Sequence, residues 1–315
     1  MSTQFEKNKS QLGKPYLDLE FLLQCFSEVL QENNESKLAS QLPWLNESEP
    51  DFEIHDQKKL FHLYSIAFQL LNLAEVNGAV QNRRQKQESE GLDSVNGLWG
   101  SVLKDLKEKG VEGKHILEQF RHNEVEPVLT AHPTEAKRPV VLGLYRQLYL
   151  LMVKLENSMY NSYEREGVKY DIKRILHKLW FIGEIFMEKP AVESELENVL
   201  HYYYKVFPEV LPLLDFRLKQ AWREIGFSPA DLEDSSSFPS ITFGNWVGGD
   251  RDGHPLVTAK VTAYTLNAFR LHAFKLIISK LDELSDKLSI YCDSKLLPAD
   301  FNKRLNELEM ATGQG

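Results

Sequence analysis

The sequence is poor in cysteine, in basic residues and in long apolar runs, and each shortage excludes a class of protein. Two cysteines are too few for a disulfide framework and indicate a reducing compartment. The 37 basic residues are outnumbered by 46 acidic ones, and the resulting net charge of −9 argues against a general nucleic-acid binder. We find no apolar run of transmembrane length and no apolar signal segment near the N-terminus. We therefore expect a cytoplasmic protein that does not bind nucleic acid or membranes.

The composition is otherwise that of a globular protein, with 42% hydrophobic and 26% charged residues in a chain of 315. Apolar residues recur at helical spacing over most of the chain. This spacing predicts helices over residues 18–31, 56–84, 98–109, 113–121, 140–159, 170–187, 195–225 and 257–291. Residues 87–97 are predicted to be a polar break between helices.

Two short apolar runs, residues 125–129 and 240–247, interrupt the helical pattern and predict buried strands. Each run ends in an unusual polar turn. We expect Phe243 and Trp246, near the second turn, to be core residues. Cys25 lies in an apolar helical stripe, which predicts an unreactive core thiol.

The first turn spans residues 128–138 and carries His132. Pro133 disfavours a helical conformation for His132, so the imidazole is expected at the end of a strand on a rigid turn. Thr130 and Thr134 can hydrogen-bond the neighbouring backbone and stabilise the turn. A histidine here can accept or donate a proton near neutral pH. The alternative interpretation is a connection in which His132 only caps the following helix.

The second turn spans residues 243–255 and combines glycines with an arginine between two aspartates. The glycines permit tight turns and the close approach of an anion. Asp250 and Asp252 flank Arg251 and can orient its guanidinium toward a phosphate or carboxylate. The alternative is a solvated turn with a local ion pair. A calcium loop is disfavoured, because the positions that follow lack further oxygen ligands.

Together the two turns resemble the phosphoenolpyruvate carboxylase family. Its T-A-H-P-T-[EQ] motif is matched by residues 130–135, and its W-M-G-G-D-R-D-G-N-P motif by residues 246–255. Residues 68–84 are similar to its L-x-N-x-A-E helix. The resemblance implies that His132 transfers a proton and that Arg138 and Arg251 bind substrate. It implies supporting roles for Thr130, Thr134, Gly248, Gly249, Asp250 and Asp252.

The reaction that the resemblance implies is the carboxylation of phosphoenolpyruvate by bicarbonate, which gives oxaloacetate and phosphate and feeds the tricarboxylic acid cycle. Bicarbonate attacks the phosphorus and forms carboxyphosphate and an enolate. The histidine then takes the carboxyphosphate proton, and the enolate attacks the released carbon dioxide. The resemblance also implies Mg²⁺ or Mn²⁺ as the metal, with no metal ligand in this chain, and a homotetrameric parent enzyme.

Three positions depart from the family pattern. Pro139 replaces a second arginine, which removes a cation near the first turn. His254 replaces asparagine and Val247 replaces methionine in the second turn. The loss of the arginine bears on anion affinity, whereas the other two changes are conservative in size or polarity.

The family is much longer than this chain and forms a helix-rich (β/α)₈ barrel. The expected fold is therefore mainly α-helical with a few short parallel strands, as the N-terminal part of an incomplete TIM barrel. We expect a flexible N-terminus over 1–17, an N-terminal helical region over 18–122, and over 123–315 the truncated start of the barrel domain with inserted helices.

Three hypotheses follow about what the chain does. The first is an N-terminal fragment of the carboxylase that is inactive alone, because the metal carboxylates and catalytic lysine of the family have no counterpart here. The second is a complete but truncated, non-catalytic paralogue that binds an anion or pairs with another subunit. The third is a helical protein that binds a metal ion with its GGDRDG turn.

Overall fold

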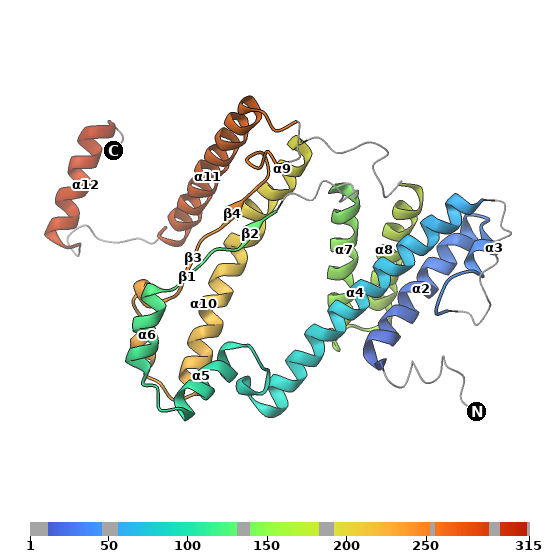
Figure 1. The fold of residues 1–315 in the computed structure, drawn as a ribbon, viewed down its shortest axis with the longest axis horizontal. Helices are drawn as coiled ribbons and strands as arrows, with labels where there is room; N and C mark the ends of the chain where they lie inside the picture. Colours follow the sequence, from blue (N-terminus) through green and yellow to red (C-terminus); the bar gives the residue numbers. More distant parts are fainter. Residues whose placement is uncertain are drawn as a thin grey trace.

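The computed structural model describes residues 12–45, 56–130, 139–182, 192–252, 256–289 and 297–313, and these residues are mainly helical (Figure 1). The longer helices are α2 (Lys14–Glu32), α4 (Gln57–Glu90), α5 (Trp99–Glu108), α6 (Gly113–His122), α7 (Pro139–Leu155), α8 (Ser162–Phe181), α9 (Val192–His201), α10 (Phe207–Glu224), α11 (Ala259–Lys287) and α12 (Ala299–Thr312). Short elements are α3 (Ser36–Ala39), the 3₁₀ turns Leu92–Ser94, Pro229–Leu232 and Ser235–Ser237, and a π-helical segment, Tyr202–Val206. None of the helices in these ranges has the length and apolar character needed to cross a bilayer.

Four two-residue strands form two parallel pairs: β1 (Glu124–Val125) with β3 (Ser240–Ile241), and β2 (Val128–Leu129) with β4 (Gly244–Asn245). The carbonyls of residues 123, 125, 127 and 129 accept hydrogen bonds of 2.9–3.3 Å from the N–H groups of residues 240, 242, 244 and 246. The hydrogen bonds donated by residues 240–246 to residues 123–129 are therefore uninterrupted. In the opposite direction Pro127 cannot donate, because it has no N–H. The prediction of short parallel strands is confirmed, and the described strands do not form a closed barrel.

The largest hydrophobic core lies among α2, α4, α7 and α8, which group together in Figure 1. Cys25 is buried within it, and burial raises the pKa of its thiol to about 12. This thiol therefore stays protonated at neutral pH, as expected for an unreactive core cysteine. The packing crosses the predicted boundary at residues 122 and 123, because α7 and α8 share this core with the N-terminal helices.

A buried polar network joins α2, α4 and the end of α7. Asn77 is fully buried, and its amide donates to Asp18 Oδ2 at 2.8 Å and to Glu156 Oε1 at 2.9 Å. Lys14 forms ion pairs with the same two carboxylates. These contacts explain why α2 begins at Lys14, within the segment predicted to be flexible, rather than at Asp18.

Two smaller cores complete the packing. The second lies among α5, α6 and α10, around the fully buried indole of Trp222, whose Nε1 donates to the Ser228 carbonyl at 3.0 Å. The third joins α9 and the beginning of α11 to the strand ends, through buried Val247 and Val257. This third core supports the two turns singled out by the sequence.

Several predicted helix limits differ from the structure, and two of the differences have a clear physical reason. Helix α4 extends into the predicted polar break as far as Glu90, because its last turns are rich in Gln, Lys, Arg and Glu, which are good helix formers without an apolar period. Helix α8 begins at Ser162 rather than residue 170, with a capping box between Asn161 and Glu164. The helix predicted over 195–225 is confirmed in its limits, since Val192–Glu224 is helical throughout, with the π-helical segment between α9 and α10.

Helix α11 has an extensive apolar surface that the described residues leave uncovered. Thr265 is its one buried residue, at 4% exposure. Its exposed large apolar side chains are Tyr264, Leu266, Leu271, Phe274, Ile277, Ile278, Leu281 and Leu284. Helix α12 lies apart from the other helices in Figure 1 and also exposes Phe301, Leu305 and Leu308.

Candidate functional site

The predicted site residues divide between described and undescribed parts of the chain. Thr130, Gly248, Gly249 and the Asp250–Asp252 segment are described. His132, Thr134 and Arg138 lie outside the described residues, as does His254. The described geometry therefore concerns the strands that lead into both turns and the first part of the second turn.

Pairing of β2 with β4 brings the beginnings of the two turns together. Leu129 lies opposite Asn245, and the N–H of Trp246 donates to the Leu129 carbonyl at 2.9 Å. Thr130, the next residue, is half-buried and begins the first turn. Because the two strands are parallel, both turns leave the same edge of the ladder. Two segments more than a hundred residues apart in sequence thus meet at one place.

Backbone hydrogen bonds shape the second turn. The Trp246 carbonyl accepts from the N–H groups of Gly249 and Asp250 at 3.0 and 2.9 Å. The Asn245 side chain accepts from the Val247 N–H and donates to the Val247 carbonyl. Sequence reasoning missed Asn245, although an asparagine at a strand end is a recognised turn-forming signal.

Arg251 lies exposed on this turn rather than buried between its neighbours. Asp250 Oδ1 accepts a hydrogen bond from the Asp252 N–H at 2.9 Å, so this carboxylate shapes the backbone. Within the described residues, no ion pair joins Arg251 to either flanking aspartate. The part of the chain that the structure describes thus leaves Arg251 exposed.

Both the backbone conformation at position 248 and the side chains around it require a glycine there. Its φ is +73°, in the region that favours glycine. A Cβ placed here would lie 2.9 Å from Thr265 Cβ and 3.0 Å from its Cγ2, and closer still to Oγ1. Thr265 Oγ1 is buried without a hydrogen-bond partner among the described residues. Helix α11 thus packs directly beneath the second turn.

Tyr203, in the π-helical segment, anchors the start of β4. Its hydroxyl lies 3.1 Å from the carbonyls of both Phe243 and Gly244. Burial raises the pKa of this hydroxyl, with Glu126 adding to the effect, so it stays a hydrogen-bond donor. Phe243 stacks on Phe207 at a centroid distance of 3.9 Å. Nothing in the Tyr202–Tyr204 run marked Tyr203 as the residue that reaches the strand.

The prediction that Trp246 is a core residue is wrong, because its side chain is 51% exposed. The neighbouring residue, Val247, is the one that turns inward, at 2% exposure. Val247 begins the turn that follows β4, and its side chain belongs to the third core. Beside this turn is a cavity of about 240 Å³ lined by Tyr203, Asn245, Gly248 and Thr265, among others.

Comparison with known proteins identifies the family of this chain. The sequence profile of the phosphoenolpyruvate carboxylase family matches residues 9–314. The chain belongs to the phosphoenolpyruvate carboxylase family. A phosphoenolpyruvate carboxylase from Methylorubrum extorquens is 31% identical over 259 residues, which are 81% of this chain and 27% of that protein.

Relatives from other bacteria match similar shares of this chain and of their own length. The phosphoenolpyruvate carboxylase of Chromobacterium violaceum is 32% identical over 231 residues, which are 73% of this chain and 25% of that protein. That of Xanthomonas euvesicatoria is 33% identical over 238 residues, which are 74% and 25% of the two chains. The chain therefore spans about a quarter of the length of these curated relatives.

Proposed function

We propose that this chain supplies part of the active site of a phosphoenolpyruvate carboxylase, which converts phosphoenolpyruvate and bicarbonate to oxaloacetate and phosphate. The observation that carries the proposal is the pairing of β2 with β4, the strands that lead into the two family turns. Catalytic groups at the carboxyl ends of parallel strands meet in this way in barrel enzymes. Membership in the family supports this reaction, and the strand pairing supports a common location for the two turns.

In this proposal the two turns have complementary roles. Arg251 and Arg138 bind the anionic substrate, since a guanidinium fork matches phosphate and carboxylate oxygens. Bicarbonate attacks the phosphorus, and the products are carboxyphosphate and the enolate of pyruvate. His132 accepts the carboxyphosphate proton, and the bond between the carboxyl carbon and the phosphate oxygen breaks, which releases carbon dioxide and inorganic phosphate. The enolate carbon then attacks the carbon dioxide and forms oxaloacetate.

Mg²⁺ or Mn²⁺ is the metal that we propose for the family reaction, which generally needs a divalent ion. The described residues do not fit such an ion, because no three of their His, Cys, Asp and Glu side chains lie close enough together to hold it. We assign no catalytic step to the metal.

The proposal extends to the architecture and setting of the enzyme. We propose that β1–β4 belong to a (β/α)₈ barrel with inserted helices that begins near residue 123, after an N-terminal helical region. The uncovered apolar side chains of α11 support this, since such a surface favours a protein partner. A homotetramer in the cytoplasm that feeds the tricarboxylic acid cycle is the setting that we propose.

Replacing Arg251 with Lys tests the substrate-binding role. In the protein expressed from its natural reading frame, we expect the KM for phosphoenolpyruvate to rise about tenfold or more, because a point charge does not replace a bidentate fork. Steady-state assays of oxaloacetate formation measure this change. Arg223→Lys, at an exposed position on α10, is the matched control and should leave the KM unchanged. A normal KM for Arg251→Lys would contradict the assignment.

A further inference from the structure

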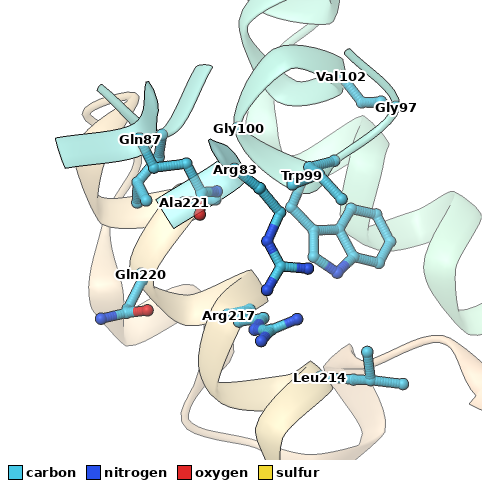
Figure 2. Close-up of a pocket in the computed structure, with 12 residues that line it drawn as sticks. Arg83, Gln87, Gly97, Trp99, Gly100, Val102, Leu214, Arg217, Gln220 and Ala221 are labelled. Atoms are coloured by element: carbon cyan, nitrogen blue, oxygen red, sulfur yellow. The ribbon is translucent and has the colours of Figure 1, made fainter. Parts of the chain in front are cut away.

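A second cavity lies between α4, α5 and α10, away from the two strand-end turns. Its volume is about 340 Å³. Its polar lining comes from Arg83 and Gln87 of α4 and from Arg217 and Gln220 of α10, while residues 97–100 close one side (Figure 2). No acidic residue lines it, although acidic residues outnumber basic ones in the whole chain.

Two arginines make the lining of this cavity positively charged. Figure 2 shows the side chains of Arg83 and Arg217 directed into the same space. Among the described residues, neither forms an ion pair with a carboxylate, whereas Lys14, Lys169 and Lys173 each do. Two like charges that share a cavity repel each other, and an oxyanion bound between them would remove that repulsion. Guanidinium groups are the side chains best shaped to bind such an oxyanion.

The N-terminus of α5 adds a second source of positive potential. The helix begins at Trp99, and its N-cap, Leu98, provides no side-chain cap. The first N–H groups of a helix lack intrahelical acceptors and carry the positive end of the helix dipole. Leu98, Trp99 and Gly100 all line the cavity, so this end of α5 borders the space that the arginines enter.

Trp99 provides an apolar wall beside these charges. Its ring is held by an edge-to-face contact with Phe120, at a centroid distance of 5.5 Å. Figure 2 shows the indole next to the Arg83 side chain. A planar apolar group attached to an anion would therefore have a surface to pack against.

We propose that this cavity binds a small organic phosphate, with its phosphoryl group between Arg83 and Arg217 and its carbon skeleton against Trp99. The amide of Gln87 supplies a further hydrogen bond. A bound phosphate would join α4, α5 and α10, and thereby link the first core of the protein to the second.

Isothermal titration of the 315-residue chain at low ionic strength tests the site, with inorganic phosphate, phenyl phosphate and succinate as probes. We expect saturable binding of both phosphates, with phenyl phosphate the tighter because of Trp99. Arg83→Gln and Arg217→Gln should each weaken binding about tenfold or more, since each removes a charged fork. Arg84→Gln is the matched control, because Arg84 is exposed on the same helix and does not line the cavity.

The variants concern half-buried or exposed side chains, and thermal unfolding checks that each remains folded. The proposal is overturned if neither phosphate binds saturably in the millimolar range. It is also overturned if Arg84→Gln weakens binding as much as Arg83→Gln, since the effect would then be general surface charge. Tighter binding of succinate than of phenyl phosphate would overturn the choice of a phosphate.

Discussion

Replacing His132 with Asn in the protein expressed from its natural reading frame is expected to reduce oxaloacetate formation by roughly a hundredfold or more. Asparagine keeps a polar side chain of similar size but cannot carry a proton at neutral pH. In the proposed sequence of steps, bicarbonate attacks phosphorus before the proton is transferred. Release of phosphate from phosphoenolpyruvate should therefore continue after oxaloacetate formation has been lost.

Two parallel assays separate these outcomes. Oxaloacetate is measured by coupled reduction to malate, and phosphate release is measured directly. His122→Asn, at the exposed C-terminal end of α6, is the control for a general effect of losing a histidine, and it should leave both rates unchanged. Near-normal oxaloacetate formation by His132→Asn would show that another group transfers the proton.

Gly248→Ala is expected to have the largest effect on stability, a loss of about 2–4 kcal/mol in the free energy of unfolding. One part is the cost of a Cβ at a φ of +73°. The other is the overlap of that Cβ with the side chain of Thr265, which is itself buried in α11. Chemical denaturation followed by circular dichroism measures the change.

Gly249→Ala is the matched control, since among the described residues its Cβ would have one neighbour within 4 Å, the Trp246 carbonyl oxygen at 3.7 Å. We expect it to cost less than about 1 kcal/mol. Combining Gly248→Ala with Thr265→Ala removes the closest atom and should recover part of the lost stability, while the backbone strain remains. Equal destabilisation by the two glycine variants would contradict the proposed packing of α11 beneath the turn.

The positions of helices could be predicted from the sequence where one face of the helix is apolar. The stripe that predicts 56–84 became the buried face of α4, because packing of an amphipathic face produces the same periodicity that sequence reasoning detects. The polar end of α4 and the polar start of α8 were missed, since exposed turns have no apolar period. The Asn161–Glu164 capping box was the available signal for α8.

Both turns of the candidate site could be identified from sequence, but the pairing of the strands that lead into them could not. The bond between Trp246 and Leu129 depends on long-range strand pairing, which leaves no local pattern. The exposure of Arg251 and the inward position of Val247 depend on how α9 and α11 pack beneath the turn. Arg83 and Arg217 are likewise far apart in sequence, and only helix packing brings them to one cavity.

The central claim is that the two turns serve one carboxylation reaction. Its most direct test is the incorporation of isotopically labelled bicarbonate into oxaloacetate, in the presence of Mg²⁺, by the protein expressed from its natural reading frame. We predict incorporation that requires phosphoenolpyruvate and releases one phosphate for each labelled product. Failure to fix label, by a folded protein that is supplied with phosphoenolpyruvate and metal, would contradict the account.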